Sequence, residues 1–118
     1  MSITPHDLKQ YAEEIASYQD KTETDTRTII NRAYYAAYHY AQQVALVHGY
    51  VCPNQTSTHQ ALLDFLAKQE HEDFAVLADN LKLLRKLRRK ADYQLDQSIT
   101  SKHEKDSLTY MAGVFTIK

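Results

Sequence analysis

The chain has 118 residues, enough for one hydrophobic core but too few for two, so we expect a single helical domain over residues 1–118. Its formal net charge of −1 excludes a globally basic nucleic-acid binder, so any contact with nucleic acid must use a local patch of cations. Two glycines and two prolines are too few for many tight turns, which favours helices over a many-stranded sheet. The lone cysteine, the lack of a signal-peptide pattern and the lack of an apolar run of roughly 20 residues predict a cytoplasmic protein that does not enter membranes.

The first helix is predicted to begin after Thr4. Thr4 occupies the N-cap position, Pro5 the first helical position, and Asp7 completes a capping box. The helix should end within residues 17–21, where a polar stretch interrupts the apolar spacing, and a second start signal follows in residues 22–25. The short connection predicts that the next helix is its antiparallel neighbour.

The second helix is predicted over about Thr26 to His48, with Gly49 as its C-terminal cap. Apolar residues within one third of its helical wheel form the expected core face: Ile29, Ala33, Ala37, Tyr40, Val44 and Val47. Three tyrosines of this helix are interpreted as packing residues: Tyr34, Tyr38 and Tyr40. Beside the core face, Arg32, Tyr35 and His39 form a polar stripe. This stripe is either a buried hydrogen-bond network or part of a functional site.

A third helix is predicted from His59 to about residue 68, with Ser57 or Thr58 as its N-cap. His59 shares a face with leucines, so it is either a core histidine or a ligand-binding one. The fourth helix is predicted over about Glu72 to Tyr93. The fifth is predicted to open with the capping box Ser101–Glu104 and to bury one stripe: Leu108, Met111, Ala112 and Phe115. The pattern predicts an all-α, antiparallel up-and-down bundle of about five helices.

Residues 81–96, LKLLRKLRRKADYQLD, combine a leucine ladder with a dense run of cations. One helical stripe contains Leu77, Leu81, Leu84, Leu87 and Ala91. Arg88 lies inside this stripe, and Asp92 lies one turn later on the same face, where it can pair with Arg88. Because an unpaired buried guanidinium is costly, we expect Arg88 to have a fixed carboxylate, phosphate or tyrosine partner. The other cations should face solvent near the negative end of the helix dipole: Lys82, Lys86, Arg89 and Lys90.

The sequence argues against several common enzyme classes. No histidine has the spacing of a zinc site, no glycine-rich phosphate loop is present, and no serine or cysteine nucleophile has a nearby base. We therefore expect no metal and no cofactor. The remaining arginine, histidine and tyrosine side chains suit phosphate. Metal-free RNA cleavage requires such a set, with two proton-transfer groups and a cation for the charge on phosphorus.

Three segments together resemble the HEPN superfamily, in particular its small stand-alone bacterial and archaeal members. They are NRAYYAAYHYA in the second helix, the start of the third helix at His59, and RRKADY at the end of the fourth. The resemblance covers roughly Arg27 to Phe115 and implies an antiparallel helical bundle, commonly dimeric, with a polar cleft at or near the dimer interface. Many members are metal-independent endoribonucleases that act as toxins or antiviral effectors, often encoded beside a nucleotidyltransferase that neutralises them. Others bind nucleotides or protein partners.

The ribonuclease motif of that superfamily is an arginine followed, after four to six residues, by a histidine near the end of the fourth helix. Arg88 matches the arginine, but Tyr93 stands where the motif has histidine. A tyrosine with an ordinary pKa of about 10 is a poor base at neutral pH. Arg32 and His39 match the arginine-six-histidine spacing, but on the second helix.

Two hypotheses stay open. In the first, the protein is an RNA-cleaving or RNA-binding effector whose catalytic residues are Arg88, Tyr93 and His39. The residues expected to contact substrate or phosphate are Arg32, Tyr35, His59, Arg85, Arg89 and Asp92. In the second, the same side chains form a structural network in a non-catalytic module that supports a homodimer or binds a partner such as a nucleotidyltransferase antitoxin. Either His39 or His59 can replace the missing histidine only if the fold brings it near Arg88.

Overall fold

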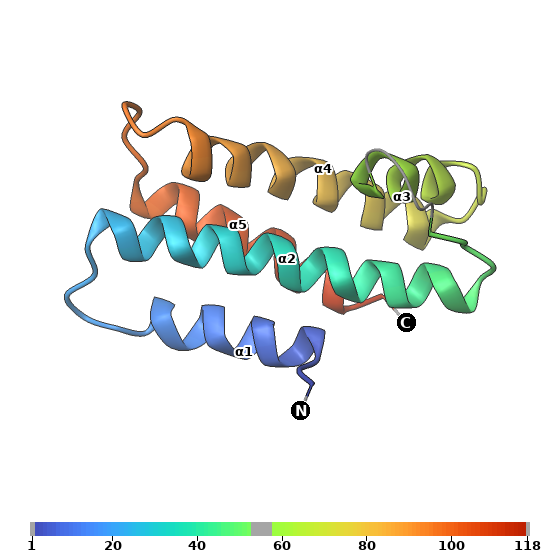
Figure 1. Cartoon of the computed structure of the whole chain (residues 1–118), viewed down its shortest axis with the longest axis horizontal. Coiled ribbons are helices and arrows are strands. Elements are labelled where there is room, and N and C mark those ends of the chain that lie inside the picture. Colours follow the sequence, from blue (N-terminus) through green and yellow to red (C-terminus); the bar gives the residue numbers. More distant parts are fainter. Residues whose placement is uncertain (1, 53–57, 118) are drawn as a thin grey trace.

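The computed structural model describes residues 2–52 and 58–117, which form five α-helices (Figure 1). They are α1 (Pro5–Ala16), α2 (Glu23–Val47), α3 (Thr58–Ala67), α4 (Glu72–Tyr93) and α5 (Ser101–Phe115). No strand lies within these two described ranges. The predicted all-α, up-and-down bundle is confirmed, as are the bounds of the fourth helix. The predicted cap at Ser57 lies outside the described residues.

A capping box starts α1 as the sequence predicts, and a second one starts α2 at the predicted start signal of residues 22–25. Thr4 Oγ1 accepts a hydrogen bond from the Asp7 backbone N–H at 3.2 Å, and the Asp7 carboxylate accepts one from the Thr4 N–H at 2.8 Å. Thr22 and Asp25 repeat this arrangement at 3.1 and 3.0 Å. Because the box includes residues before Thr26, α2 begins at Glu23 rather than at the predicted Thr26.

The N-cap of α5 is Thr100 rather than the predicted Ser101. The Thr100 backbone N–H donates to Nδ1 of His103 at 2.9 Å, so a histidine takes the place usually held by glutamate in a capping box. Glu104, the predicted capping residue, is buried instead. Its carboxylate accepts hydrogen bonds from Lys21 Nζ at 2.8 Å and from the Thr26 hydroxyl at 3.2 Å.

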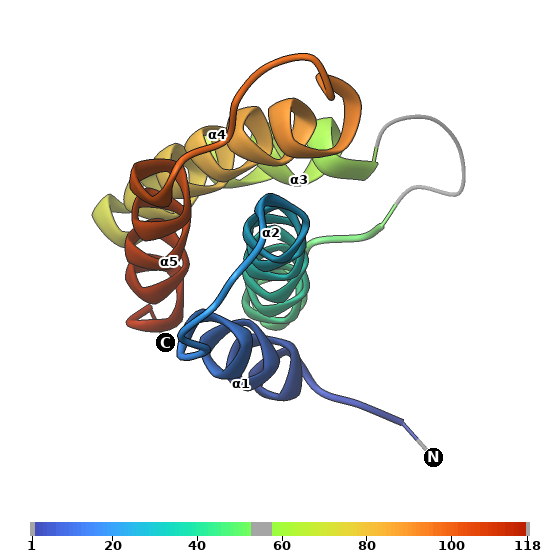
Figure 2. The same cartoon turned by 90° about the vertical axis from the view of Figure 1, so that its left-hand side faces the viewer.

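The central helix of the bundle is α2, which α1, α3, α4 and α5 all contact (Figures 1 and 2). Its buried residues therefore occupy more than one face: Thr26, Ile29, Ile30, Ala33, Tyr34, Ala36, Ala37, Tyr38, Ala41 and Ala45. The small alanines allow neighbouring helices to approach closely. The prediction that Val47 is a core residue is wrong. Its side chain is 83% exposed because the last turns of α2 extend beyond α1 (Figure 1).

The leucine ladder of α4 packs into the core, and this orients the remaining faces of the helix. Its buried residues include Leu77, Leu81, Leu84 and Ala91, whereas Leu87 is half-buried. Lys82, Lys86 and Arg89 are exposed as predicted. Lys90 is half-buried instead, because α5 brings His103 Nε2 within 3.4 Å of its Nζ. On α5, Met111 is buried as predicted, but Ala112 is exposed because the buried stripe runs through Glu104, Ser107, Met111 and Val114.

Candidate functional site

Arg88 lies among three tyrosine rings. Its guanidinium carbon is 5.7 Å from the ring centre of Tyr34 and 5.4 Å from those of Tyr35 and Tyr93. These distances fall within the range of about 6 Å for cation–π attraction. The Arg88 side chain is only 15% exposed. The rings therefore hold the guanidinium in one place at the surface of the bundle.

Two side chains of α4 fix the orientation of Arg88. Its Nε donates to Oδ2 of Asp92 at 3.1 Å, and its Nη2 donates to the Tyr93 hydroxyl at 3.3 Å. The predicted Arg88–Asp92 pair is therefore present. Burial lowers the pKa of Arg88, but Tyr35, Tyr93 and Asp92 raise it and the net direction is upward, so the guanidinium stays charged. Its Nη1 makes no hydrogen bond with any residue that the structure describes.

His59, at the start of α3, is joined to Tyr34 by a short hydrogen bond between Nδ1 and the tyrosine hydroxyl. Burial lowers the pKa of His59, and the nearby charges of Arg85 and Arg88 lower it further, so the imidazole is neutral at pH 7. Burial raises the pKa of Tyr34, which keeps its hydroxyl protonated. When Tyr34 donates to Nδ1, the neutral imidazole of His59 carries its own proton on Nε2. Tyr34 thus does more than pack, which its sequence position did not indicate.

His39 is exposed on α2 next to the same aromatic rings. Its ring centre is 5.2 Å from that of Tyr38 and 6.3 Å from that of Tyr35. No hydrogen bond joins His39 or His59 to Arg88 in the described part of the chain. Tyr35, however, contacts both histidines and Arg88. We call this group the Arg88 cluster, which comprises Tyr34, Tyr35, His39, His59, Arg88, Asp92 and Tyr93.

Arg32 is joined to the Arg88 cluster by hydrogen bonds that run through Asn31. Its Nε donates to Oδ1 of Asn31 at 2.9 Å, and Asn31 Nδ2 donates to Oδ2 of Asp92 at 3.0 Å. Arg32, Asn31 and Asp92 together line a hollow of about 420 Å³ beside Tyr11 of α1. Asn31 therefore connects two groups of predicted residues, although its only signal in the sequence is its place in NRAYY.

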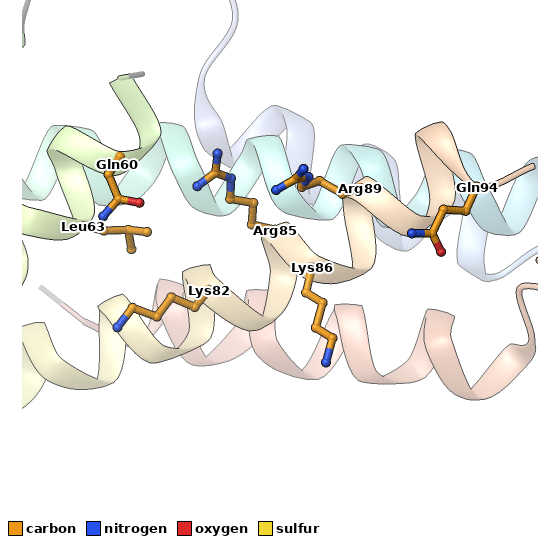
Figure 3. Close-up of a pocket in the computed structure, with 7 residues that line it drawn as sticks. All are labelled: Gln60, Leu63, Lys82, Arg85, Lys86, Arg89 and Gln94. Carbon is orange, nitrogen blue, oxygen red and sulfur yellow. The ribbon is translucent and has the colours of Figure 1, made fainter. Parts of the chain in front are cut away.

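A groove of about 480 Å³ runs along the outer face of α4 (Figure 3). Its cations are Lys82, Arg85, Lys86 and Arg89, and we call it the basic groove. Gln60 and Leu63 of α3 line one side, and Gln94 follows the end of α4. No carboxylate is among the described residues that line it. Within residues 2–52 and 58–117, none of the four cations makes a salt bridge.

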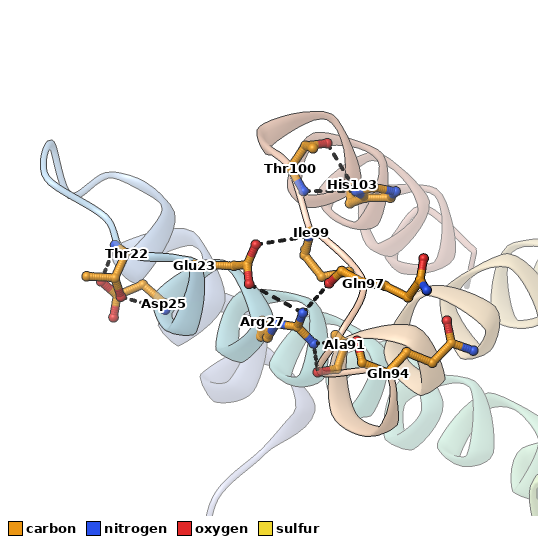
Figure 4. A network of polar contacts seen from close by, with 10 residues as sticks. All are labelled: Thr22, Glu23, Asp25, Arg27, Ala91, Gln94, Gln97, Ile99, Thr100 and His103. Carbon is orange, nitrogen blue, oxygen red and sulfur yellow. Dashed lines mark hydrogen bonds and ion pairs between the residues drawn. The ribbon is translucent and has the colours of Figure 1, made fainter.

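Arg27 of α2 holds the C-terminal end of α4 in place (Figure 4). Its guanidinium donates to three backbone carbonyls, those of Ala91 at 2.8 Å, Gln94 at 3.3 Å and Gln97 at 2.5 Å. Beside it, the Glu23 carboxylate accepts a hydrogen bond from the Ile99 N–H at 3.1 Å. The last carbonyls of a helix have no partner within that helix, so Arg27 stabilises the turn that carries Asp92 and Tyr93.

In the described part of the chain, no three His, Cys, Asp or Glu side chains are grouped so that they could hold a metal ion. The helices there are also too short or too polar to cross a membrane.

Comparison with known proteins identifies the family. No curated protein and no solved structure matches the chain significantly. The family model of the HEPN domain, in contrast, matches residues 6–118, which is nearly the whole chain. This match agrees with the five-helix bundle and with the resemblance carried by NRAYYAAYHYA and RRKADY. The chain therefore belongs to the HEPN domain family.

Proposed function

We propose that this protein is an RNA-directed effector that binds a phosphodiester at the Arg88 cluster and cleaves RNA without a metal ion. The observation that carries the proposal is the state of Arg88, which stays charged and is oriented by three rings and two hydrogen bonds. Its Nη1 makes no hydrogen bond within the described chain and is free to bind a phosphate oxygen. A pre-oriented guanidinium suits the charge that develops on phosphorus.

The surrounding residues supply the proton transfers. His39, exposed on α2, takes the proton of the RNA 2′-hydroxyl as its oxygen attacks phosphorus. Tyr93 accepts a hydrogen bond from Arg88, and its hydroxyl donates a proton to the 5′-oxygen as the P–O5′ bond breaks. The Nε2–H of His59 donates to a phosphate oxygen. The products are a 2′,3′-cyclic phosphate and a 5′-hydroxyl end.

The test is RNA cleavage in the presence of a chelator, on a pool of structured and single-stranded RNA. Wild-type protein should release fragments with cyclic phosphate ends. Arg88→Gln and His39→Ala should each lower the rate by about 10²-fold or more. His6→Ala, which removes a histidine of α1 outside the Arg88 cluster, should cleave like the wild type. Intact RNA with wild-type protein, or full activity of Arg88→Gln, would overturn the proposal.

A second candidate function is a non-catalytic interaction module that forms a homodimer or binds a nucleotidyltransferase antitoxin. Its support is the hydrogen-bonded chain from Arg32 through Asn31 and Asp92 to Arg88, in which Arg88 already has protein partners. Such a network can exist for structural reasons alone. Under this alternative, wild-type protein leaves RNA intact, and Arg88→Gln loses stability without any change in RNA binding.

A further inference from the structure

We propose that the basic groove on α4 binds the backbone of single-stranded RNA and leads it into the Arg88 cluster. This inference rests on the proposed function and specifies its substrate class. The groove binds phosphates that neighbour the reacting phosphate along the RNA strand. It therefore contributes to binding affinity and does not take part in the chemistry.

Four cations line the groove, and no carboxylate is among the described residues that line it with them. On α1 and α5, two lysines are each followed one turn later by an ion-pair partner, in Lys9–Glu13 at 3.0 Å and Lys102–Asp106 at 2.8 Å. In the groove, Lys82 is followed by Lys86, and Arg85 is followed by Arg89 (Figure 3). Like charges at this helical spacing repel each other. An anionic ligand along α4 removes this repulsion.

The groove adjoins the Arg88 cluster, because its Gln60 directly follows His59 on α3 and its Arg89 directly follows Arg88 on α4. Arg85 lines the groove, and its charge acts on Tyr34 and His59, where it lowers the pKa of each. A phosphodiester backbone bound along α4 therefore passes from Lys82 and Lys86 to Arg85, and its next phosphate meets Arg88. The cations lie on consecutive turns of one rigid helix, so they form a continuous track.

The exposed ring of Tyr93 favours a single strand over a duplex. Tyr93 is 70% exposed and directly precedes Gln94, which lines the end of the groove. Bases in a duplex are stacked on one another, whereas an unpaired base is free to stack on an aromatic side chain. A cationic groove that ends at an accessible aromatic ring is the arrangement by which proteins bind single strands.

The test is fluorescence anisotropy with a labelled 2′-O-methyl oligouridine, which lacks the nucleophile for cleavage. Lys82→Gln/Lys86→Gln should weaken binding about tenfold or more near physiological salt. It should also reduce the slope of log K against log salt by about 1.4, since each phosphate contact with a single strand contributes about 0.7. Tyr93→Ala should weaken binding with little change in that slope, because stacking releases no counterions.

The matched control is Lys9→Gln/Lys105→Gln, which makes the same change in net charge outside the groove. Lys9 lies on α1, across α2 from α4 (Figure 2). This control should bind like the wild type. An equal loss in the control, an unchanged salt slope in Lys82→Gln/Lys86→Gln, or equal affinity for a blunt RNA duplex would overturn the inference. Failure of the proposed function gives a different result, in which the groove variants lose binding but the wild type cleaves no RNA.

Discussion

At the scale of single residues, the contacts of Arg88 connect stability with function. The rings of Tyr34, Tyr35 and Tyr93 and the carboxylate of Asp92 surround a guanidinium that still keeps one nitrogen without a hydrogen bond to any described residue. A guanidinium needed only for structure gains nothing from an N–H group that has no hydrogen-bond acceptor. One that binds a ligand requires it.

The Arg88–Asp92 pair can be measured with a double-mutant cycle of Arg88→Gln and Asp92→Asn. Because both side chains are largely but not fully buried, we expect a coupling energy of about 1 kcal/mol in urea unfolding. Arg88→Gln alone should cost about 1–2 kcal/mol. A loss above about 3 kcal/mol would indicate a chiefly structural arginine.

His59 should make the stability of the protein depend on pH. Burial and the charges of Arg85 and Arg88 lower its pKa in the folded state, so the unfolded chain binds a proton more readily. The contribution of neutral His59 to the free energy of unfolding is complete above the ordinary histidine pKa of about 6.5. It is lost as the pH falls below that value, and the free energy of unfolding then decreases by at most about 1.4 kcal/mol per pH unit. We expect the Tm to fall from pH 7.5 to pH 5.5.

The comparison variant is His59→Gln, whose amide oxygen can accept the Tyr34 proton but does not titrate. The difference between the two pH profiles removes the contributions of the other histidines. Parallel profiles for His59→Gln and the wild type would contradict the expected role of His59.

At the scale of secondary-structure elements, α4 carries most of the candidate site. The helices packed against α4 determine which of its faces is buried and which is exposed. The leucine ladder packs against α2 and α5, so the exposed cations form the basic groove beside α3. The inward turn of Arg88 follows from the same rotation of the helix. One helix thus presents a core face, a ligand-binding cluster and a charged track.

The end of α4 should depend on Arg27. Arg27→Ala leaves the carbonyls of Ala91, Gln94 and Gln97 without their donor, at an expected cost of about 1–2 kcal/mol. Hydrogen exchange should show faster exchange at the Gln94 amide, which bonds to the Lys90 carbonyl at 3.1 Å. Arg32→Ala, on the same helix, should leave that amide protected. Equal protection in both variants would contradict a capping role for Arg27.

At the scale of the whole molecule, the formal net charge is only −1, but the positive charges are distributed unevenly over the surface. Within the described residues the four groove cations make no salt bridge and no carboxylate lines their groove, whereas Lys21 pairs with the buried Glu104 at 2.8 Å. A local field of this kind attracts nucleic acid without making the protein basic overall. The homodimer and the nucleotidyltransferase partner implied by the HEPN resemblance stay predictions.

The sequence by itself determined the features that depend on residues within one or two turns of each other. Capping boxes at Thr4 and Thr22, the bounds of α4 and the Arg88–Asp92 pair are all set by neighbours three or four residues apart, which helical periodicity reveals. The family followed from segments such as NRAYYAAYHYA, and the family model matches residues 6–118.

Only the tertiary structure determined which residues of different helices contact one another. Tyr34 and His59 are 25 residues apart, and Arg27 is 64 residues from the Ala91 carbonyl that it binds. Periodicity describes the faces of one helix but not its rotation against another. It therefore could not show that Asn31 of α2 reaches Asp92 of α4, that Val47 is exposed, or that Arg85 lies close to Tyr34 and His59, because each of these depends on how separate helices pack together.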